Sequence, residues 1–215
     1  MKTGILFDLD GTLLDTLEDL LDATNYALRV HSYPPRNLTE LRRFVGNGAL
    51  NQIRMSLPEG TEEQAGQVLA TYKPYYTAHC QNKTKPYAGI PEALDLLGKN
   101  YPLAIVSNKP DSAVKALCAQ YFPGIFALGE TLGCPRKPAA DMVFKAMEAI
   151  GAEKCVYVGD SEVDVLTARN AKVPCLSVLW GFRDRQELEA VGAQYFCETP
   201  GTLIRCIQRI LWEDA

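Results

Sequence analysis

The segment that decides the fold reads ILFDLDGTL and spans residues 5–13. Its apolar start leads into Asp8 and Asp10, which are two positions apart and therefore share one face of an extended strand. Burying two carboxylates at the end of a strand costs free energy unless something neutralises them. We therefore expect a buried strand whose carboxylates bind a divalent cation and leave Asp8 able to act as a nucleophile.

Three further apolar runs alternate with segments of helical periodicity. The runs cover residues 103–106, 155–158 and 175–179, and a turn-forming sequence follows each of them. Strands that are apolar throughout, and not only at alternate positions, are typical of a parallel sheet covered on both faces. Because helical patterns separate the runs, we predict an α/β fold, a doubly wound parallel sheet with a Rossmann-like core.

Residues 15–83 interrupt this alternation because they contain no convincing strand. Four segments within them place apolar residues at helical spacing. The fourth segment opens with Thr61 and Gln64, which have the spacing of a capping box. We therefore predict an all-helical cap domain over residues 15–83, inserted into an α/β core made of residues 1–14 and 84–215.

The composition limits the classes of function. Of the 215 residues, 47% are hydrophobic and 22% are charged, as in ordinary globular proteins, and the formal net charge is −4. This charge argues against a nucleic-acid or anionic-membrane partner, and no apolar run approaches the roughly 20 residues of a membrane span. The seven cysteines have no zinc-site or disulfide-framework spacing. With no leader pattern at the start, we expect a cytoplasmic protein, monomeric or homodimeric.

Four polar clusters occur at or just after the ends of predicted strands. Ligands of open α/β sheets bind at the carboxyl ends of the strands, so we expect the clusters to form one site. The clusters are Asp8, Asp10 and Thr12; Ser107 and Asn108; Lys137, which precedes Pro138 at the predicted start of a helix; and Asp160, Ser161 and Asp164.

The carboxylates in these clusters suit phosphoryl chemistry. Mg²⁺ prefers oxygen ligands, which Asp8 and Asp160 can supply, and it usually keeps a substrate phosphate in its coordination shell. An ionised Asp8 is then a competent nucleophile toward phosphorus. Asp10 can act as acid to the leaving oxygen and later as base to water.

The remaining polar groups can bind the phosphoryl oxygens. Ser107, Asn108 and the backbone N–H groups after Gly11 are candidate hydrogen-bond donors. Gly11 and Thr12 are therefore predicted to bind phosphate as well. Lys137 offers a positive charge either to the phosphate or to Asp8. The neighbouring Arg136 is the competing candidate for that charge.

Taken in order, four motifs resemble those of the haloacid dehalogenase superfamily. They read DLDGTL at 8–13, SN at 107–108, KP at 137–138 and GDSEVD at 159–164. Within the superfamily the chain most resembles the phosphoglycolate phosphatase-like branch, through VGNG at 45–48, YAGI at 87–90 and WGF at 180–182. It departs from the family pattern at Val163, where a small polar residue is frequent, and at Ala171-Lys172, where Ala-Gly is common.

The resemblance implies a role for each matching position. Asp8 would form an aspartyl-phosphate, while Asp10 would be the acid/base and would bind Mg²⁺ through its backbone carbonyl. Asp160 would be the third protein ligand. Asp164 would orient Lys137 or a water on the metal, or would serve as an alternative ligand. The second aspartate, Asp10, favours a phosphatase over a dehalogenase.

Side chains of the cap could select the leaving group. Arg42, Arg43 and Asn47 flank a glycine-containing loop that could close on a substrate carboxylate or sugar, which makes Arg43 and Asn47 candidate substrate-binding residues. A solvated helix end is the alternative interpretation. Three tyrosines of the fourth predicted helix are interpreted as cap packing: Tyr72, Tyr75 and Tyr76.

The sequence therefore predicts a Mg²⁺-dependent phosphatase for a small phosphorylated metabolite, with phosphoglycolate as the leading substrate. The cap would close to exclude water. A sugar phosphomutase, a pyrophosphatase or a phosphonatase of the same superfamily remains an alternative. Outside the enzymes, the alternative is a non-catalytic protein that binds a phosphorylated ligand.

Overall fold

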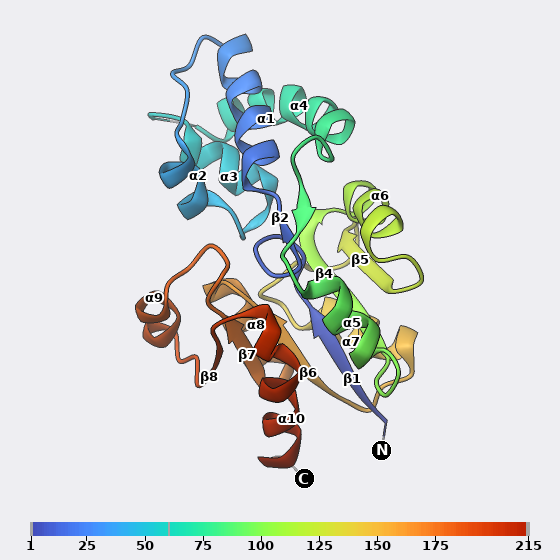
Figure 1. The fold of residues 1–215 in the computed structure, drawn as a ribbon. Coiled ribbons are helices and arrows are strands. Elements are labelled where there is room, and N and C mark those ends of the chain that lie inside the picture. Colours follow the sequence, from blue (N-terminus) through green and yellow to red (C-terminus); the bar gives the residue numbers. More distant parts are fainter. Residues whose placement is uncertain (1, 60, 214–215) are drawn as a thin grey trace.

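A six-stranded parallel sheet forms the centre of the protein (Figure 1). The computed structural model describes residues 2–59 and 61–213. The strand order is β5-β4-β1-β6-β7-β8, so β1, which leads into the two aspartates, has partners on both sides. The strands are β1 (Thr3–Phe7), β4 (Leu103–Pro110), β5 (Phe126–Glu130), β6 (Lys154–Gly159), β7 (Cys175–Val178) and β8 (Tyr195–Cys197).

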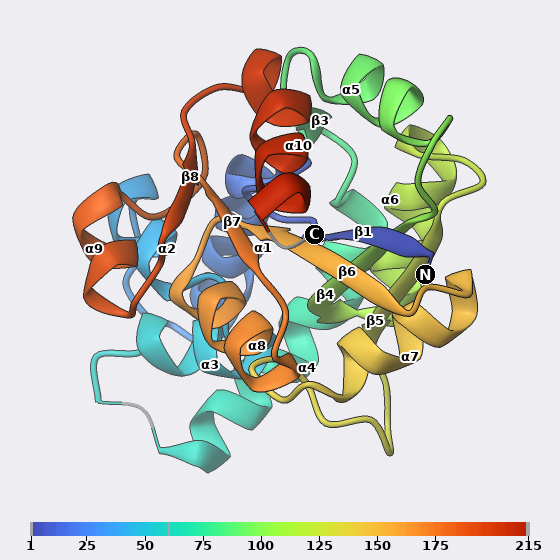
Figure 2. The ribbon, with the colours of Figure 1, turned by 90° about the horizontal axis from the view of Figure 1, so that it is seen from below.

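Helices cover both faces of the sheet, as strands without a polar face require (Figure 2). Successive residues of β1 point to opposite faces, so Ile5 and Phe7 join the larger core cluster and Leu6 joins the smaller one. Each such side chain, when fully buried, contributes about 1.5–3 kcal/mol to folding. The larger cluster lies under α5 (Ile90–Leu97), α6 (Asp111–Tyr121) and α10 (Leu203–Glu213), and the smaller under α7 (Asp141–Ile150) and α8 (Glu162–Ala171).

Four helices form an insert at the end of the sheet away from both marked chain ends (Figure 1). We call α1 (Leu17–Val30), α2 (Leu38–Phe44), α3 (Gly48–Ser56) and α4 (Glu62–His79) the helical insert. Two short antiparallel strands, β2 (Leu14–Asp15) and β3 (Lys85–Pro86), connect it to the core. The predicted capping box is present, because Thr61 Oγ1 accepts from the Gln64 N–H at 3.2 Å and the Gln64 side chain accepts from the Thr61 N–H at 3.0 Å.

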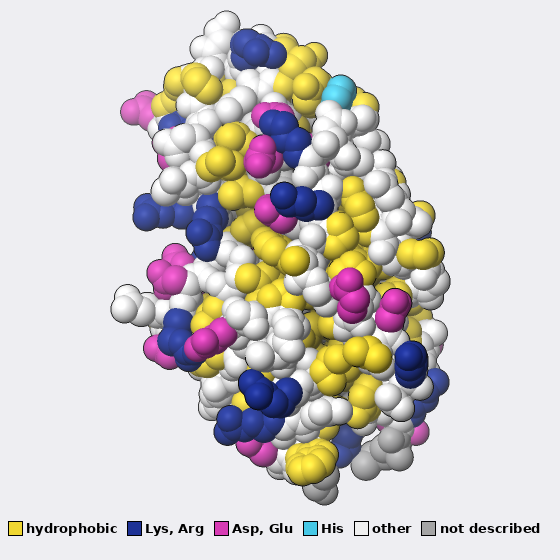
Figure 3. Space-filling model, viewed as in Figure 1, with side chains coloured by type: hydrophobic (Ala, Val, Ile, Leu, Met, Phe, Trp, Pro, Cys, Tyr) yellow, Lys and Arg dark blue, Asp and Glu magenta, His cyan; other side chains and the backbone are white. Residues whose placement is uncertain are grey.

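The surface carries mixed charge. Lys and Arg side chains are interspersed with Asp and Glu over the face shown in Figure 3, which agrees with the small net charge of −4. Among the helices in the described part of the chain, none has the length and apolar character needed to cross a membrane.

The predicted α/β class is confirmed, and the three apolar runs correspond to β4, β6 and β7. The sequence patterns do not predict β5 and β8, because both are short strands at the edges of the sheet with partly exposed side chains. Two helices near the end of the chain, α9 (Arg185–Ala190) and α10, are also absent from the prediction. The sequence does contain a helical pattern for α10, because Leu203, Ile207 and Ile210, which are buried, have helical spacing.

One prediction about a helix start is wrong. Lys137-Pro138 does not open a helix, because α7 begins at Asp141. The N–H of Ala139 instead donates to the carbonyl of Arg136 at 3.0 Å, which closes a turn around Lys137 and Pro138. That turn precedes α7 and holds Lys137 in the buried interior of the site.

Candidate active site

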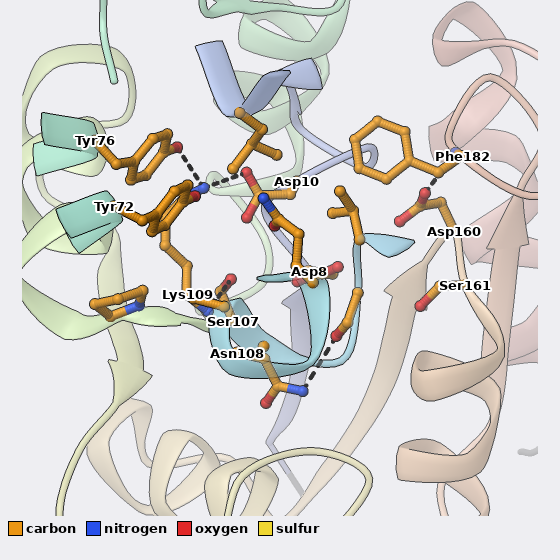
Figure 4. Close-up of a pocket in the computed structure, with 17 residues that line it drawn as sticks. Asp8, Asp10, Tyr72, Tyr76, Ser107, Asn108, Lys109, Asp160, Ser161 and Phe182 are labelled. Carbon is orange, nitrogen blue, oxygen red and sulfur yellow. Dashed lines mark hydrogen bonds and ion pairs between the residues drawn. The ribbon is translucent and has the colours of Figure 1, made fainter. Parts of the chain in front are cut away.

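The carboxyl ends of β1, β4 and β6 meet at the edge of the sheet that faces the insert (Figure 4). Asp8 directly follows β1, Ser107 lies in the last part of β4, and Asp160 directly follows β6. These three residues line one pocket together with residues of the insert. The insert contributes Leu20, Val45, Gly46, Gly48, Ala49, Gln52, Tyr72 and Tyr76.

Lys137 is buried between two carboxylates of this site. Its Nζ lies 2.8 Å from Asp8 Oδ1 and 2.8 Å from Asp164 Oδ1, and it donates to the Tyr157 hydroxyl at 3.0 Å. Burial lowers the pKa of a lysine, but Asp164 and Asp8 outweigh that effect and raise the pKa of Lys137 well above its usual value. Lys137 is thus a fixed positive charge against Asp8, whereas the side chain of Arg136, the competing candidate, is 38% exposed.

Three carboxylates converge beside this lysine. Asp8, Asp160 and Asp164 each offer an oxygen, and the three oxygens lie within 4.8 Å of one another. Burial, with help from Asp164, raises the pKa of Asp8 to about 7, although Lys137 opposes the rise. Burial and the other two carboxylates raise the pKa of Asp160 well above its usual value. One lysine therefore does not compensate the cluster, and an all-oxygen donor set with excess negative charge fits a hard divalent cation such as Mg²⁺.

Neutral donors hold Asp160 in place. Thr12 Oγ1 donates to Asp160 Oδ1 at 3.1 Å, and the Phe182 N–H donates to Oδ2 at 2.7 Å. Gly11 has a φ of +80° and lies so close to Asp160 that a Cβ would clash with the carboxylate. The side chain of Thr12 is therefore directed at Asp160, and the predicted phosphate-binding role of Thr12 stays a prediction.

Asp164 organises the start of α8 and the position of Lys137. Its Oδ1 pairs with Lys137 and accepts from the Tyr157 hydroxyl at 3.2 Å. Its Oδ2 accepts from the N–H and the hydroxyl of Ser161 at 3.1 and 2.7 Å, and from the Asp160 N–H at 3.3 Å. Among the roles predicted for Asp164, these contacts favour the one in which Asp164 orients Lys137.

The carboxylate of Asp10 contacts a different lysine. Asp10 Oδ1 accepts from Thr16 Oγ1 at 2.6 Å and lies 2.6 Å from Lys109 Nζ. Lys109 also donates to the Tyr76 hydroxyl at 2.7 Å, so it joins the core to α4 of the insert (Figure 4). Lys109 was not among the predicted site residues. A lysine at the end of an otherwise buried strand could have indicated it, because such a charge needs a partner.

The tyrosines of α4 do more than pack. Tyr72 and Tyr76 stack with ring centroids 5.4 Å apart, as cap packing predicts. Both also line the pocket, and Tyr76 contacts Lys109. Helical spacing places Tyr72 and Tyr76 on the buried face of α4 with Val68, whereas Tyr75 lies off that face and stacks on Tyr26 at 3.8 Å.

Ser107 and Asn108 differ in what they can offer a phosphate. Ser107 Oγ accepts from the Lys109 N–H at 3.2 Å, which leaves its own hydroxyl hydrogen for a ligand. The Asn108 amide nitrogen donates to the carbonyls of Gly46 and Lys137 at 3.2 and 2.9 Å. Both amide hydrogens thus have acceptors in this structure, where Asn108 ties the insert to the core, and its phosphate-binding role stays a prediction.

Two arginines form hydrogen bonds between the insert and the core. Arg42 donates to the carbonyls of Gly181 and Phe182 at 2.6 and 2.7 Å, and Arg183 donates to the carbonyls of Arg42 and Val45 at 2.8 and 3.0 Å. These bonds join the insert to the loop that holds Asp160.

The predicted substrate-binding role of Arg43 and Asn47 stays a prediction. Arg43 is exposed and Asn47 is half-buried, and neither lines the pocket. The glycines on either side of Asn47, Gly46 and Gly48, line it instead, because both have positive φ and the turn they form presents backbone to the pocket.

Comparison with known proteins agrees with this geometry. Residues 5–178 match the family model for haloacid dehalogenase-like hydrolases. A phosphoglycolate phosphatase from Rhodobacter capsulatus is 33% identical over 193 residues, which cover 85% of this chain and 87% of that protein. Another from Pseudomonas putida is 32% identical over 221 residues, with 96% and 78% covered. A solved structure from Lactobacillus delbrueckii subsp. bulgaricus superposes with a TM-score of 0.90 at 36% identity, covering 96% of this chain and 99% of the other.

Proposed function

Because the chain belongs to the haloacid dehalogenase-like hydrolase family, in its phosphoglycolate phosphatase-like branch, and is a phosphoric monoester hydrolase, we propose a specific reaction for it. The protein hydrolyses a small phosphate monoester through an aspartyl-phosphate on Asp8, with Mg²⁺ as cofactor. The observation that carries this proposal is the buried carboxylate cluster around Lys137 at a pocket shared by core and insert.

The cluster accounts for the proposed cofactor. Asp8 and Asp160 would hold Mg²⁺ with the backbone carbonyl of Asp10, and Asp164 would orient Lys137 beside them. When bound, the ion keeps Asp8 ionised despite its burial and neutralises charge on the phosphoryl group. Thr12 and the Phe182 N–H fix the orientation of the Asp160 carboxylate. Asp160 would therefore need little rearrangement to bind the ion.

The first chemical step transfers the phosphoryl group to the protein. A carboxylate oxygen of Asp8 attacks phosphorus, and the bond between phosphorus and the leaving oxygen breaks. Asp10, which lines the same pocket, donates its proton to that oxygen, so the leaving group departs as an alcohol. Lys137 and the Ser107 hydroxyl stabilise the negative charge beside Asp8.

The second step returns the protein to its starting state. Water attacks the phosphorus of the aspartyl-phosphate, and Asp10, now a carboxylate, takes the proton from that water. The bond between phosphorus and the Asp8 oxygen breaks and inorganic phosphate leaves. Asp10 is then protonated again and Asp8 is free, so all atoms and charges balance over the cycle.

The helical insert serves as the cap in this proposal, with the bounds predicted from the sequence, residues 15–83. Its contacts with the core run through Arg42, Arg183 and Asn108, and its side chains Gln52, Tyr72 and Tyr76 line the same pocket as Asp8. A pocket lined by both the core and the insert suits a small leaving group. Phosphoglycolate is the leading substrate because the related proteins from Rhodobacter capsulatus and Pseudomonas putida carry that activity in their names.

A phosphate-release assay over small phosphomonoesters tests the proposal. We expect release of inorganic phosphate with Mg²⁺, none in EDTA, and none from an Asp8→Asn variant that remains folded. Asp95→Asn is the matched control, because Asp95 is exposed on α5 and far from the cluster in the fold. Phosphate release by the Asp8 variant at the wild-type rate would overturn the mechanism, and isomerisation without phosphate release would indicate a mutase.

A further inference from the structure

We infer that Lys109 is a positioning residue for the acid/base Asp10, and that Tyr76 of the insert fixes Lys109 in that role. The inference rests on the proposed function, because it assigns partners to the proton carrier of that reaction. It concerns a lysine outside the four motifs from which the function was predicted.

The geometry around the Asp10 carboxylate is asymmetric. Lys109 Nζ and Thr16 Oγ1 both lie 2.6 Å from the same oxygen, Oδ1. Within the described part of the chain, every side-chain donor to this carboxylate reaches Oδ1. The other oxygen, Oδ2, is therefore the one left to give a proton to the leaving group and to take one from water.

Lys109 has little freedom to adopt another position. Its side chain is 4% exposed and that of Asp10 is 12% exposed, so the pair lies in a region of low dielectric constant. The Tyr76 hydroxyl accepts a second hydrogen bond from Nζ at 2.7 Å, and Nζ lies 4.7 Å from the centre of the Tyr76 ring. A buried ammonium group held by a carboxylate and a phenol keeps one orientation, which is what a positioning residue requires.

Tyr76 belongs to α4 of the insert, whereas Lys109 and Asp10 belong to the core. The contact between Tyr76 and Lys109 forms only when the insert packs on the core as in Figure 4. Lys109, the charged partner of Asp10, therefore has its full set of partners only in a covered site. This arrangement links the position of the proton carrier to the exclusion of water.

Lys109 is also a cation in the pocket, so it could instead bind a carboxylate of the leaving group. The structure favours positioning, because Lys109 Nζ already donates to Asp10 Oδ1 at 2.6 Å and to the Tyr76 hydroxyl at 2.7 Å, which takes two of its three hydrogens. The two roles predict different dependence on the substrate. A positioning residue matters for every leaving group that needs a proton, whereas a carboxylate-binding residue matters only for substrates that carry a carboxylate.

Three substrates separate these roles in the full-length protein with Mg²⁺. Phosphoglycolate has a carboxylate and a poor leaving group, ethyl phosphate has only the poor leaving group, and p-nitrophenyl phosphate has a leaving group that departs without a proton. The measured quantity is kcat/KM, which reports the steps up to phosphoryl transfer. The variants are Lys109→Met and Tyr76→Phe, with Lys99→Met on the exposed surface as the control.

We expect Lys109→Met to lower kcat/KM by about 10- to 100-fold for both alkyl phosphates, part of the 10²- to 10⁴-fold range for general acid catalysis, and by less than about threefold for p-nitrophenyl phosphate. Tyr76→Phe keeps the ring and removes only the hydroxyl. It should give the same pattern with a smaller loss, about 3- to 10-fold, because it removes one hydrogen bond from Lys109 and leaves the contact between Lys109 and Asp10 in place.

Equal losses on all three substrates, or a loss confined to phosphoglycolate, would overturn the inference. If Lys109→Met fails to fold because Asp10 loses its charged partner, Tyr76→Phe alone gives the same comparison. Failure of the proposed function is distinguishable, because the wild-type protein would then not release phosphate from any of the three substrates, or Asp8→Asn would remain active.

Discussion

Replacing Asp8 with asparagine should stabilise the metal-free protein at neutral pH, although the same replacement is expected to abolish turnover. In the folded chain, burial raises the pKa of Asp8 from its ordinary value of 3.8 to about 7. The folded state therefore binds one more proton than the unfolded chain between these two pH values. Stability from this group is fully present below pH 4 and is lost as the pH rises to about 7.

The magnitude follows from the same two values. At about 1.4 kcal/mol for each pH unit, the interval from 3.8 to about 7 corresponds to about 4 kcal/mol of destabilisation above pH 7. This value is an upper limit for the stabilisation, because asparagine also removes the ion pair between Asp8 and Lys137 at 2.8 Å. Lys137 keeps Asp164, also at 2.8 Å, as its remaining carboxylate partner. In a chain of this length, 1 kcal/mol moves the unfolding midpoint by about 2–4 °C, so a rise of several degrees is expected.

Urea unfolding in EDTA at a series of pH values from 4 to 8 measures the effect. The difference in unfolding free energy, Asp8→Asn minus wild type, should be near zero at pH 4 and should grow until about pH 7. Asp95→Asn, at an exposed position, should show no such growth. If the Asp8 variant is less stable than wild type at pH 7.5 without metal, the ion pair with Lys137 outweighs the burial of Asp8, and the reasoning fails.

Three further predictions concern the metal, the insert and one strained residue. Mg²⁺ at about 100 times its Kd should raise the unfolding free energy of the wild type by about 2.7 kcal/mol, and Asp160→Asn should lose this gain; equal gains in both proteins would contradict the proposed site. Arg183→Met should speed hydrogen exchange of residues 38–45 by about tenfold or more, since its hydrogen bonds to their carbonyls are charge-assisted, while exposed Arg185→Met should not. Lys172 has a φ of +57°, so Lys172→Gly should raise the urea-unfolding free energy by about 0.5–1 kcal/mol without changing activity; no gain would show that the left-handed conformation carries no strain.

Lys172 also explains a departure visible in the sequence. The residue after Ala171 is the C-cap of α8, and it adopts the left-handed conformation that glycine tolerates best. The chain keeps the conformation with a lysine in place of glycine. The lysine at this position therefore affects the C-terminal end of α8, whereas Asp164 lies in the first turn of the helix. The carboxylate cluster is unaffected.

The residues of the cluster were predictable because local sequence restricts them. Asp8, Ser107 and Asp160 each come at the end of an apolar run, and the carboxyl ends of parallel strands meet at one edge of the sheet. The contacts of Asn108, Thr12 and Arg43 were not predictable in the same way. Each of these side chains could contact a ligand, a backbone carbonyl or solvent. Which contact forms depends on the groups that the insert and the 180–183 loop place next to the side chain.

The sequence by itself determined the fold class, the helical insert after the first strand, and the identity of the carboxylates and of Lys137, because strand periodicity and motif order are properties of neighbouring residues. Only the tertiary structure decided that Lys137 pairs with Asp8 and Asp164 while Lys109 pairs with Asp10 and Tyr76. The physical reason is that each buried lysine needs carboxylate or hydroxyl partners from segments far away in the chain. Which partner each lysine finds is set by how the insert packs on the sheet.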